Sequence, residues 1–186
     1  MCSETRAFIG LGANVGDRRA HIEAALAAMA AHPRIAIVRC TAPVETEPWG
    51  VADQPAFLNA VAEVQTTLDP KELLQSLKRM ERELGRTPGR RWGPREIDLD
   101  ILLFGDSVID DSSLVIPHPE LTARPFVLSQ LIELDEHLVH PRLGRLLTSI
   151  AAASVSLDRA GDATGSRNEA PSAHAELSSN LATKNR

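Results

Sequence analysis

The sequence predicts an α+β fold, a ferredoxin-like βαββαβ core with an antiparallel sheet and additional C-terminal helices. Strand and helix signals alternate in the order β-α-β-β-α-β, the split βαβ pattern of these folds. The helical segments repeat apolar residues every three or four positions, whereas the strand segments are short apolar or alternating runs. With 186 residues, of which 43% are hydrophobic, the chain is long enough to build the core of one such domain.

The first half of the predicted core is a strand, a helix and a second strand. Arg6–Leu11 is a short apolar run that ends in glycine-rich turn chemistry, as a buried strand does. Asp17 is a suitable N-cap for the next segment, whose apolar stripe covers Ile22–Met29 at helical spacing. His32 precedes a proline, which disfavours helical backbone and ends the helix. The second strand is Ile35–Cys40.

The second half of the core is a strand, a helix and a last strand. Apolar residues alternate over Phe57–Val64, which predicts a strand with two distinct faces. Asp69 and Pro70 open a helix, because proline is favoured at the first helical position, and Gly85 closes it. Ile97–Phe104 is the last strand of the core.

Two further helices and a tail are expected after the core. The helices cover about Arg124–Leu134 and Arg142–Ala153 and add an extra layer. From Val155 onward the composition shifts to small and polar residues, which bury too little apolar surface to offset the entropy of ordering. We therefore expect one domain over residues 1–154 and a disordered tail over 155–186.

Composition excludes several classes of protein. The formal net charge of −5 and the isoelectric point near 5.7 argue against a nucleic-acid binder that works by overall charge. No apolar stretch is long enough to span a membrane, and Met1–Arg6 is polar, unlike a secretory signal. Cys2 and Cys40 are read as free thiols of a reducing compartment. We expect a cytosolic protein with no membrane or nucleic-acid partner.

The last core strand contains two acids within an apolar run. Because strand side chains alternate, Asp98 and Asp100 share one face, about 7 Å apart, while Leu99, Ile101 and Leu103 share the other. A hard divalent cation with oxygen ligands relieves the repulsion between two such carboxylates, and Mg²⁺ prefers few carboxylates together with water and phosphate. The alternative is a pair of acids on a solvated sheet face that binds nothing.

A basic loop leads directly into these acids. Gly85–Arg95 contains four arginines, two prolines, three glycines and one tryptophan. Arginine binds phosphate oxygens in bidentate fashion, and a loop of guanidinium groups beside a magnesium site suits triphosphate chemistry. A solvated surface loop or a nucleic-acid patch is the alternative, but the neighbouring acids favour a nucleotide.

An aromatic residue and an amide share one face of another strand. Phe57 could stack on a flat heterocycle, and Asn59 offers it both a donor and an acceptor. A strand phenylalanine is more often part of the core, so this signal alone is weak. Gly10–Gly16 follows a strand but does not match a dinucleotide fingerprint, and a tight turn is the simpler interpretation. His118, between two prolines, is the histidine best placed for a role.

Several blocks together resemble a known family. Arg91–Leu102 closely resembles the signature of the 6-hydroxymethyl-7,8-dihydropterin pyrophosphokinases of folate biosynthesis. The similarity extends over about Ala7–Ala152. The other matching blocks are Gly10–Asp17, Thr46–Gly50, Asp53–Pro55, Phe57–Ala60 and Pro117–Pro119.

The resemblance implies an enzyme that binds MgATP and then the pterin, and transfers the β,γ-pyrophosphoryl group to the pterin hydroxymethyl with release of AMP. By motif, Asp98 and Asp100 would hold two Mg²⁺ ions. Arg86 and Arg95 would contact the phosphates and stabilise the transition state, with Arg91 in the same loop.

The resemblance also implies a monomer and the remaining site positions. Residues expected at the ATP are Lys78, Glu81, Trp92, Arg95, Ile101, His118 and Arg124. Residues expected at the pterin are Thr46, Glu47, Trp49, Phe57, Asn59, Asp98 and Phe126. The chain departs from many relatives at Pro88, where they carry a second arginine that Arg90 could replace.

Two other functions are weighed against this one. An RNA-binding module has the same order of elements, but acids on a strand face are unfavourable beside RNA phosphates. A regulator that binds nucleotide without catalysis would not need the acid pair and Arg95 to be intact.

Overall fold

The computed structural model describes residues 4–48, 54–87 and 93–162, with residues 155–162 described by their backbone only. The strands of the main sheet are β1 (Thr5–Ala13), β2 (Ile35–Cys40), β3 (Val44–Thr46), β4 (Phe57–Thr66) and β5 (Asp98–Phe104). The helices are α1 (Arg18–Ala30), α2 (Pro70–Glu83), α3 (Pro125–Leu134) and α4 (Leu147–Asp162). Two small hairpins are formed by β6 (Ile109–Asp110) with β7 (Val115–Ile116) and by β8 (Val139–His140) with β9 (Arg145–Leu146).

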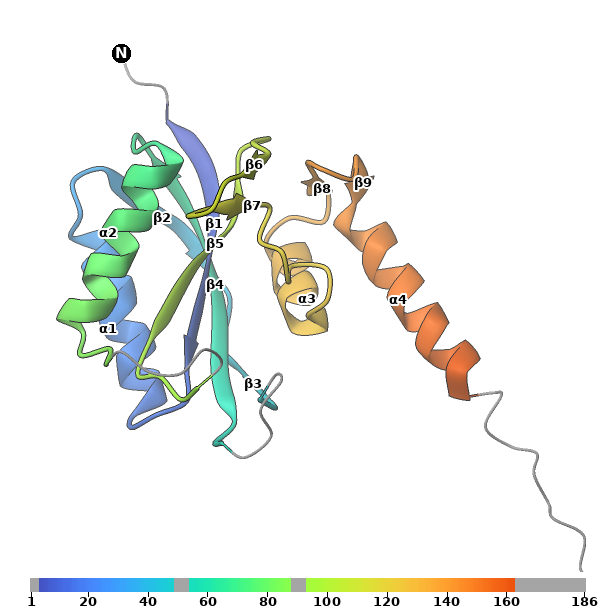
Figure 1. Cartoon of the computed structure of the whole chain (residues 1–186), viewed down its shortest axis with the longest axis horizontal. Helices are drawn as coiled ribbons and strands as arrows, with labels where there is room; N and C mark the ends of the chain where they lie inside the picture. Colours follow the sequence, from blue (N-terminus) through green and yellow to red (C-terminus); the bar gives the residue numbers. More distant parts are fainter. Residues whose placement is uncertain (1–3, 49–53, 88–92, 163–186) are drawn as a thin grey trace, which may run out of the picture.

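The sheet separates two hydrophobic cores. Helices α1 and α2 cover one face and α3 covers the other (Figure 1). Ile22 of α1 and Leu77 of α2 are fully buried against the first face. On the second face Phe8 of β1 packs with Leu131 of α3, and Ile150 joins α4 to the same core. Apolar burial on both faces therefore fixes the sheet between its helices.

The strand order is β2-β4-β1-β5, all neighbours antiparallel, with β3 also paired to β4. β1 is central and β5 forms one edge. In register, Gly12 of β1 lies between Asn59 of β4 and Asp98 of β5, and Gly10 lies opposite Asp100. The strand that carries the acids and the strand that carries the amide thus flank a stretch of β1 with small residues.

The first two helices begin where the sequence predicts. The Asp17 carboxylate accepts a hydrogen bond from the Ala20 amide at 3.0 Å, which caps α1. Asp69 and Glu72 form a reciprocal capping box at the start of α2, with Pro70 in the first turn. Gly85 follows α2 with φ +91°, a conformation that side chains other than glycine rarely adopt.

A bulge in β5 overturns one predicted face. Phe8 pairs with Leu103 and Ile9 pairs with Ile101, so Leu102 is an extra residue without a partner in this ladder. Leu102 and Leu103 both pack in the core on the α3 face, whereas Ile101 packs on the α1 and α2 face. The prediction that Leu103 shares a face with Leu99 and Ile101 is therefore wrong, because a bulge shifts the side-chain alternation by one residue.

The C-terminal elements differ from their predicted bounds. The last helix starts at Leu147 instead of Arg142, because Arg145–Leu146 pairs with β8 in a hairpin. It continues past Val155 to Asp162, so the first part of the expected tail is helical, and residues 163–186 lie outside the described part of the chain. Strand β3 and the small hairpins were not predicted, since two or three residues give too little periodicity to read.

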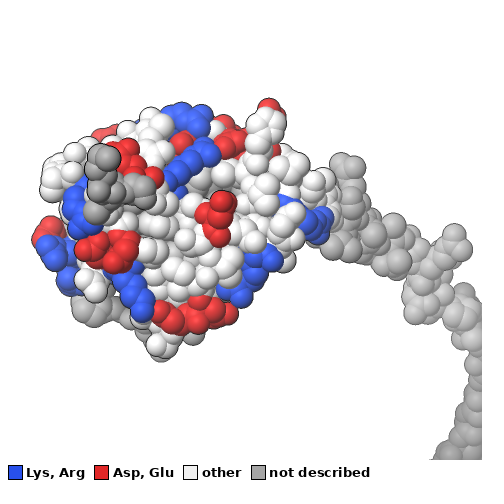
Figure 2. Space-filling view, turned by 90° about the horizontal axis from the view of Figure 1, so that it is seen from above, with Lys and Arg blue, Asp and Glu red and all other residues white. Residues whose placement is uncertain are grey.

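Charge is mixed on the surface. On the face drawn in Figure 2, basic and acidic side chains are interspersed and not gathered into one patch of a single sign.

Within the described ranges, no helix combines the length and the apolar character that crossing a lipid bilayer requires.

Candidate active site

A pocket of about 360 Å³ lies between the sheet and α3. It is lined by β1, β3, β4 and β5, by Lys78 of α2, by α3, and by the segments after β3, after α2 and after β7. Residues predicted for the site that line it are Thr46, Glu47, Phe57, Asn59, Lys78, Arg86, Arg95, Asp98, Asp100, His118, Arg124 and Phe126. Positions far apart in the sequence are thus brought to one cavity, as the site hypothesis requires.

The two acids of β5 face the pocket together. The side chain of Asp98 is 18% exposed and that of Asp100 is 35% exposed. Asp98 Oδ1 lies 2.8 Å from Arg86 Nη1, and its Oδ2 is paired with Arg95. Burial alone would raise the pKa of Asp98, but the charges of Lys78, Arg95 and Arg86 hold it below its usual range. Asp98 is therefore ionised, and both acids already have basic side chains beside them.

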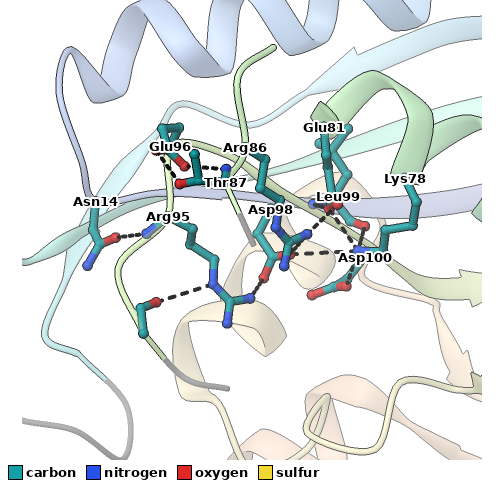
Figure 3. A network of polar contacts seen from close by, with 11 residues as sticks. Asn14, Lys78, Glu81, Arg86, Thr87, Arg95, Glu96, Asp98, Leu99 and Asp100 are labelled. Atoms are coloured by element: carbon teal, nitrogen blue, oxygen red, sulfur yellow. Dashed lines mark hydrogen bonds and ion pairs between the residues drawn. The ribbon is translucent and has the colours of Figure 1, made fainter. Parts of the chain in front are cut away.

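Helix α2 holds the peptide between the two acids. Glu81 Oε1 accepts a hydrogen bond from the Leu99 amide at 2.7 Å, and Lys78 Nζ donates to the Leu99 carbonyl at 2.9 Å (Figure 3). Since β5 is an edge strand, these groups of Leu99 have no neighbouring strand on that side, and the two α2 side chains satisfy them instead. The arrangement fixes the backbone from which Asp98 and Asp100 project.

Charge and burial act against each other at this contact. Burial would lower the pKa of the Lys78 ammonium, but Asp100, Asp98 and Glu81 raise it above its usual value. The pKa of Glu81 is raised because its carboxylate is buried, although Lys78 opposes the shift. Glu81 also pairs with Arg86. The buried carboxylate of Glu81 thus links the end of α2 to Arg86, the first arginine of the basic loop.

Asn14 fixes the backbone of the second arginine. Its side-chain Oδ1 accepts a hydrogen bond from the Arg95 backbone amide at 2.8 Å (Figure 3). Its own backbone amide donates to the Arg95 carbonyl at 3.1 Å. Its Nδ2 donates to the Pro55 carbonyl at 3.1 Å. Asn14 is almost fully buried, so these bonds anchor the end of the basic segment to β1. The sequence offered only the position of Asn14 in Gly10–Gly16, which was read as a turn.

The other end of the pocket is aromatic and amide-lined. Phe57 and Asn59 project from β4, and Phe126 projects from the start of α3. Asn59 Nδ2 donates to Thr46 Oγ1 at 2.7 Å, which orients the amide. A Cβ on Gly12 would lie 2.8 Å from Asn59 Oδ1, so only glycine allows this approach. The predicted separation of Phe57 and Asn59 from the apolar face of β4 is confirmed.

Gln130 supports this end from α3 and was not found by sequence reasoning. Its Nε2 donates to the carbonyls of Asn59 at 3.1 Å and Ala42 at 3.3 Å. The residue is 2% exposed, and its Oε1 is buried without a hydrogen-bond partner among the described residues. Two acceptors on one side identify the amide orientation, because a flipped amide would face them with its oxygen. A glutamine in an apolar helical stripe gave no distinguishing signal.

His118 is held beside the bulge of β5. Its amide donates to the Leu102 carbonyl at 3.0 Å, and its Nδ1 accepts from the Glu120 amide at 3.1 Å. The neutral ring therefore has its proton on Nε2. Burial lowers the pKa of His118, which favours this neutral form.

The donor set suits a hard cation that phosphates complete. In the part of the chain that the structure describes, no cluster of three or more His, Cys, Asp or Glu residues could enclose a metal. The candidate metal ligands are the two carboxylates that face the pocket from the same side of β5, Asp98 and Asp100. Mg²⁺ is bound in this way, by one or two carboxylates with water and substrate phosphates, so the residues fit it.

Comparison with known proteins identifies the family. The model of the family described as 7,8-dihydro-6-hydroxymethylpterin-pyrophosphokinase matches residues 8–136. The 2-amino-4-hydroxy-6-hydroxymethyldihydropteridine pyrophosphokinase of Bacillus subtilis is 44% identical over 132 residues, which cover 71% of this chain and 79% of that protein. The Pseudomonas aeruginosa protein of the same name is 43% identical over 148 residues, covering 80% and 91%. The chain belongs to this pyrophosphokinase family.

The fold of this pyrophosphokinase also has solved counterparts. The crystal structure of Plasmodium falciparum HPPK-DHPS A437G with SDX-DHP superposes with a TM-score of 0.67 at 16% identity, covering 84% of this chain. The match covers 46% of that longer chain, so this likeness concerns the fold of the shared part. Family membership makes the chain a transferase that uses ATP.

Not every residue expected from the pyrophosphokinase motif lines the pocket. The side chain of Ile101 is buried in the core on the α1 and α2 face. The side chain of Glu81 is almost fully buried, and it contacts the backbone of Leu99 between the two acids. Trp49, Arg91 and Trp92 lie outside the described residues.

Proposed function

We propose that this enzyme transfers the pyrophosphoryl group of MgATP to 6-hydroxymethyl-7,8-dihydropterin, giving the pterin diphosphate and AMP, a step of folate biosynthesis. The observation that supports this most directly is the pocket itself. One end is lined by Asp98 and Asp100 together with basic side chains, and we call it the phosphate end. The other end is lined by Phe57, Asn59 and Phe126. A triphosphate and a flat heterocycle therefore fit one cavity, which brings the two reacting groups together.

The bond changes follow from the products. The pterin hydroxymethyl oxygen attacks the β-phosphorus of ATP, the bond between the α,β-bridging oxygen and that phosphorus breaks, and AMP leaves with the bridging oxygen. The hydroxyl proton passes to solvent, and the β,γ-pyrophosphoryl group ends on the pterin. Metal ions neutralise charge on the phosphates during such transfers. Two Mg²⁺ ions at Asp98 and Asp100 are proposed for this purpose.

Arg86 and Arg95 are proposed to exchange partners during the cycle. Both guanidinium groups are paired with Asp98, which would itself bind the metal. A guanidinium released from a carboxylate is ready to bind a phosphate group, because both oxyanions accept paired hydrogen bonds from the planar guanidinium. Arg91 is proposed to join them from the same segment. Their positive charge then stabilises the transferring group.

The remaining nucleotide contacts are proposed at Lys78, Glu81, Trp92, Ile101, His118 and Arg124. His118 and Arg124 line the pocket beside Asp100, which supports their placement. Glu81 and Ile101 do not line it, so any contact from Ile101 would use its backbone, and Glu81 would act through Lys78 and Arg86.

The pterin is proposed to stack between Phe57 and Phe126. Asn59 would read its polar edge, with Thr46 and Glu47 beside it and Asp98 reaching from the phosphate end. Backbone groups near Thr46–Trp49 are proposed to contribute to the same end. Aromatic stacking supplies affinity for a flat ring, while a buried amide with fixed orientation supplies selectivity for its hydrogen-bonding edge.

Broader features are proposed with this function. The strand order β2-β4-β1-β5 with α1 and α2 on one face supports a ferredoxin-like core. A catalytic domain over residues 1–154, the part of the disordered tail expected after α4, a monomeric state and a cytosolic location remain predictions. The RNA-binding alternative is less favoured, because both acids face the pocket that a phosphate backbone would have to enter.

The test combines the protein with ATP, Mg²⁺ and 6-hydroxymethyl-7,8-dihydropterin and separates the nucleotides by chromatography. AMP should accumulate in step with the pterin diphosphate, and omission of the pterin should abolish it. The appearance of ADP in place of AMP would rule out pyrophosphoryl transfer.

A further inference from the structure

The two acids of the proposed metal site are already paired with basic side chains. Among the described residues the network contains three acids and three bases, so their formal charges cancel. The acids are Glu81, Asp98 and Asp100, and the bases are Lys78, Arg86 and Arg95. Two of the bases, Arg86 and Arg95, belong to the segment that joins α2 to β5. Lys78 differs from them, because it comes from the middle of a packed helix.

Lys78 is held at a defined place between the carboxylates. Its Nζ lies 2.7 Å from Glu81 Oε1 and 2.9 Å from the Leu99 carbonyl oxygen. The same atom is 3.3 Å from Asp100 Oδ1 and 3.7 Å from Asp98 Oδ1 (Figure 3). Four oxygens from α2 and β5 thus surround one ammonium group. Such a set of oxygens would otherwise repel one another.

We propose that Lys78 is a resident counter-cation of the metal site: its ammonium keeps Asp98 and Asp100 in place before a divalent ion arrives and weakens binding of that ion in the absence of nucleotide. This inference rests on the proposed metal role of the two acids.

The physical reason is competition between like charges. An ammonium 3.3 Å from Asp100 repels a divalent ion that binds the same carboxylate. ATP brings its own negative charge, which offsets the repulsion and supplies further ligands. The metal is therefore expected to load as a metal–nucleotide complex, and the empty enzyme remains charge-balanced and stable. Lys78 cannot move far aside, because the buried Glu81 and the Leu99 carbonyl hold its ammonium.

The experiment measures Mn²⁺ binding to the nucleotide-free protein by the electron paramagnetic resonance signal of free Mn²⁺. Lys78→Gln removes the charge and retains a donor for the Leu99 carbonyl. We expect it to bind Mn²⁺ roughly tenfold more tightly than the wild type, or better. Lys78→Arg keeps the charge and should bind as weakly as the wild type.

Lys71→Gln is the matched control. Lys71 lies on the same helix, but its side chain is 62% exposed and pairs with Asp111 away from the pocket. The Lys71→Gln substitution removes the same unit charge as Lys78→Gln. Because screened surface charges interact weakly, its Mn²⁺ affinity should stay within about twofold of the wild-type value. An affinity of Lys78→Gln equal to or weaker than that of the wild type overturns the inference.

Two further measurements distinguish failure of the Lys78 inference from failure of the proposed metal role. If Lys78→Gln is unfolded at the assay temperature, Mn²⁺ should restore its folding in a thermal melt, and lack of restoration contradicts the role. Mn²⁺ binding is also measured with a non-hydrolysable ATP analogue. If the wild type then binds no more Mn²⁺ than the analogue alone does, the proposed metal role fails. If the wild type does bind Mn²⁺ with the analogue, and Lys78→Gln leaves the Mn²⁺ affinity of the nucleotide-free protein unchanged, only the Lys78 inference fails.

Discussion

Replacing Gly12 by alanine tests how closely β1 and β4 must approach at the pterin end of the pocket. The new Cβ would lie 2.8 Å from Asn59 Oδ1, a distance that real Cβ atoms essentially never show. It would also lie 3.9 Å from Phe57 Cδ1, which is an ordinary contact. Because the short contact involves the end of a side chain, Asn59 can rotate while the backbone stays in place. We expect a folded protein with a displaced Asn59.

The size of the effect follows from the displacement. Asn59 Oδ1 must retreat by about 0.6 Å, from 2.8 to 3.4 Å, to reach ordinary contact. That movement disrupts the 2.7 Å hydrogen bond to Thr46 Oγ1, and each such bond contributes about 0.5–1.5 kcal/mol. Together with weaker bonding to the pterin edge, we expect a loss of about 2 kcal/mol in pterin binding, or roughly 30-fold in Kd.

Isothermal titration of the pterin into enzyme loaded with Mg²⁺ and a non-hydrolysable ATP analogue measures this loss. Nucleotide affinity should change little, since the three atoms nearest to the new Cβ all belong to Asn59 and Phe57. Gly10→Ala is the control on the same strand, because its Cβ would meet Leu102 at 3.4–3.5 Å, which its flexible side chain can accommodate. We expect it to weaken pterin binding by less than about threefold.

A double-mutant cycle decides whether the loss acts through Asn59. In an Asn59→Ala background, Gly12→Ala should cost almost nothing, because the contact it creates no longer exists. Wild-type pterin affinity in Gly12→Ala, or an equal loss in both backgrounds, would refute the reasoning.

Three further perturbations address the acids, the arginines and stability. Asp100→Asn should abolish AMP formation with little change in the far-ultraviolet circular dichroism spectrum; near-normal turnover in Mg²⁺ contradicts the metal role. Arg95→Ala should lower kcat at saturating ATP, and a rise in KM for ATP alone would exclude a transition-state role. Glu63→Gln should cost about 2 kcal/mol in urea unfolding, because it breaks the partly buried pairs of the Glu63 carboxylate with Arg6 at 2.8 Å and Arg39 at 2.6 Å. Burial would raise the pKa of Glu63, but these partners hold it below its usual value, so its stabilisation is present above about pH 4.5 and is lost on further acidification. Glu63→Gln should therefore flatten the acid limb of the stability curve, and an unchanged slope would count against these pairs.

Local patterns in the sequence were sufficient for the elements of the core. The caps at Asp17 and Asp69 and the alternation in β4 depend on neighbouring residues, so they can be read along the chain. The shared face of Asp98 and Asp100 was predicted in the same way and is confirmed by their common pocket. The same alternation failed at Leu103, because a bulge depends on how two strands pair.

The sequence by itself determined which residue types bear the chemistry: two acids on one strand face, arginines before them, and an aromatic and an amide on another strand. Tertiary structure alone decided how they are held. Asn14 reaches Arg95 across 81 positions, and Gln130 reaches Asn59 across 71. Lys78 meets the acids only because α2 packs against the free edge of β5. Such contacts arise when whole elements bury their apolar faces together, and no local spacing in the chain encodes the side chains that this burial brings into reach.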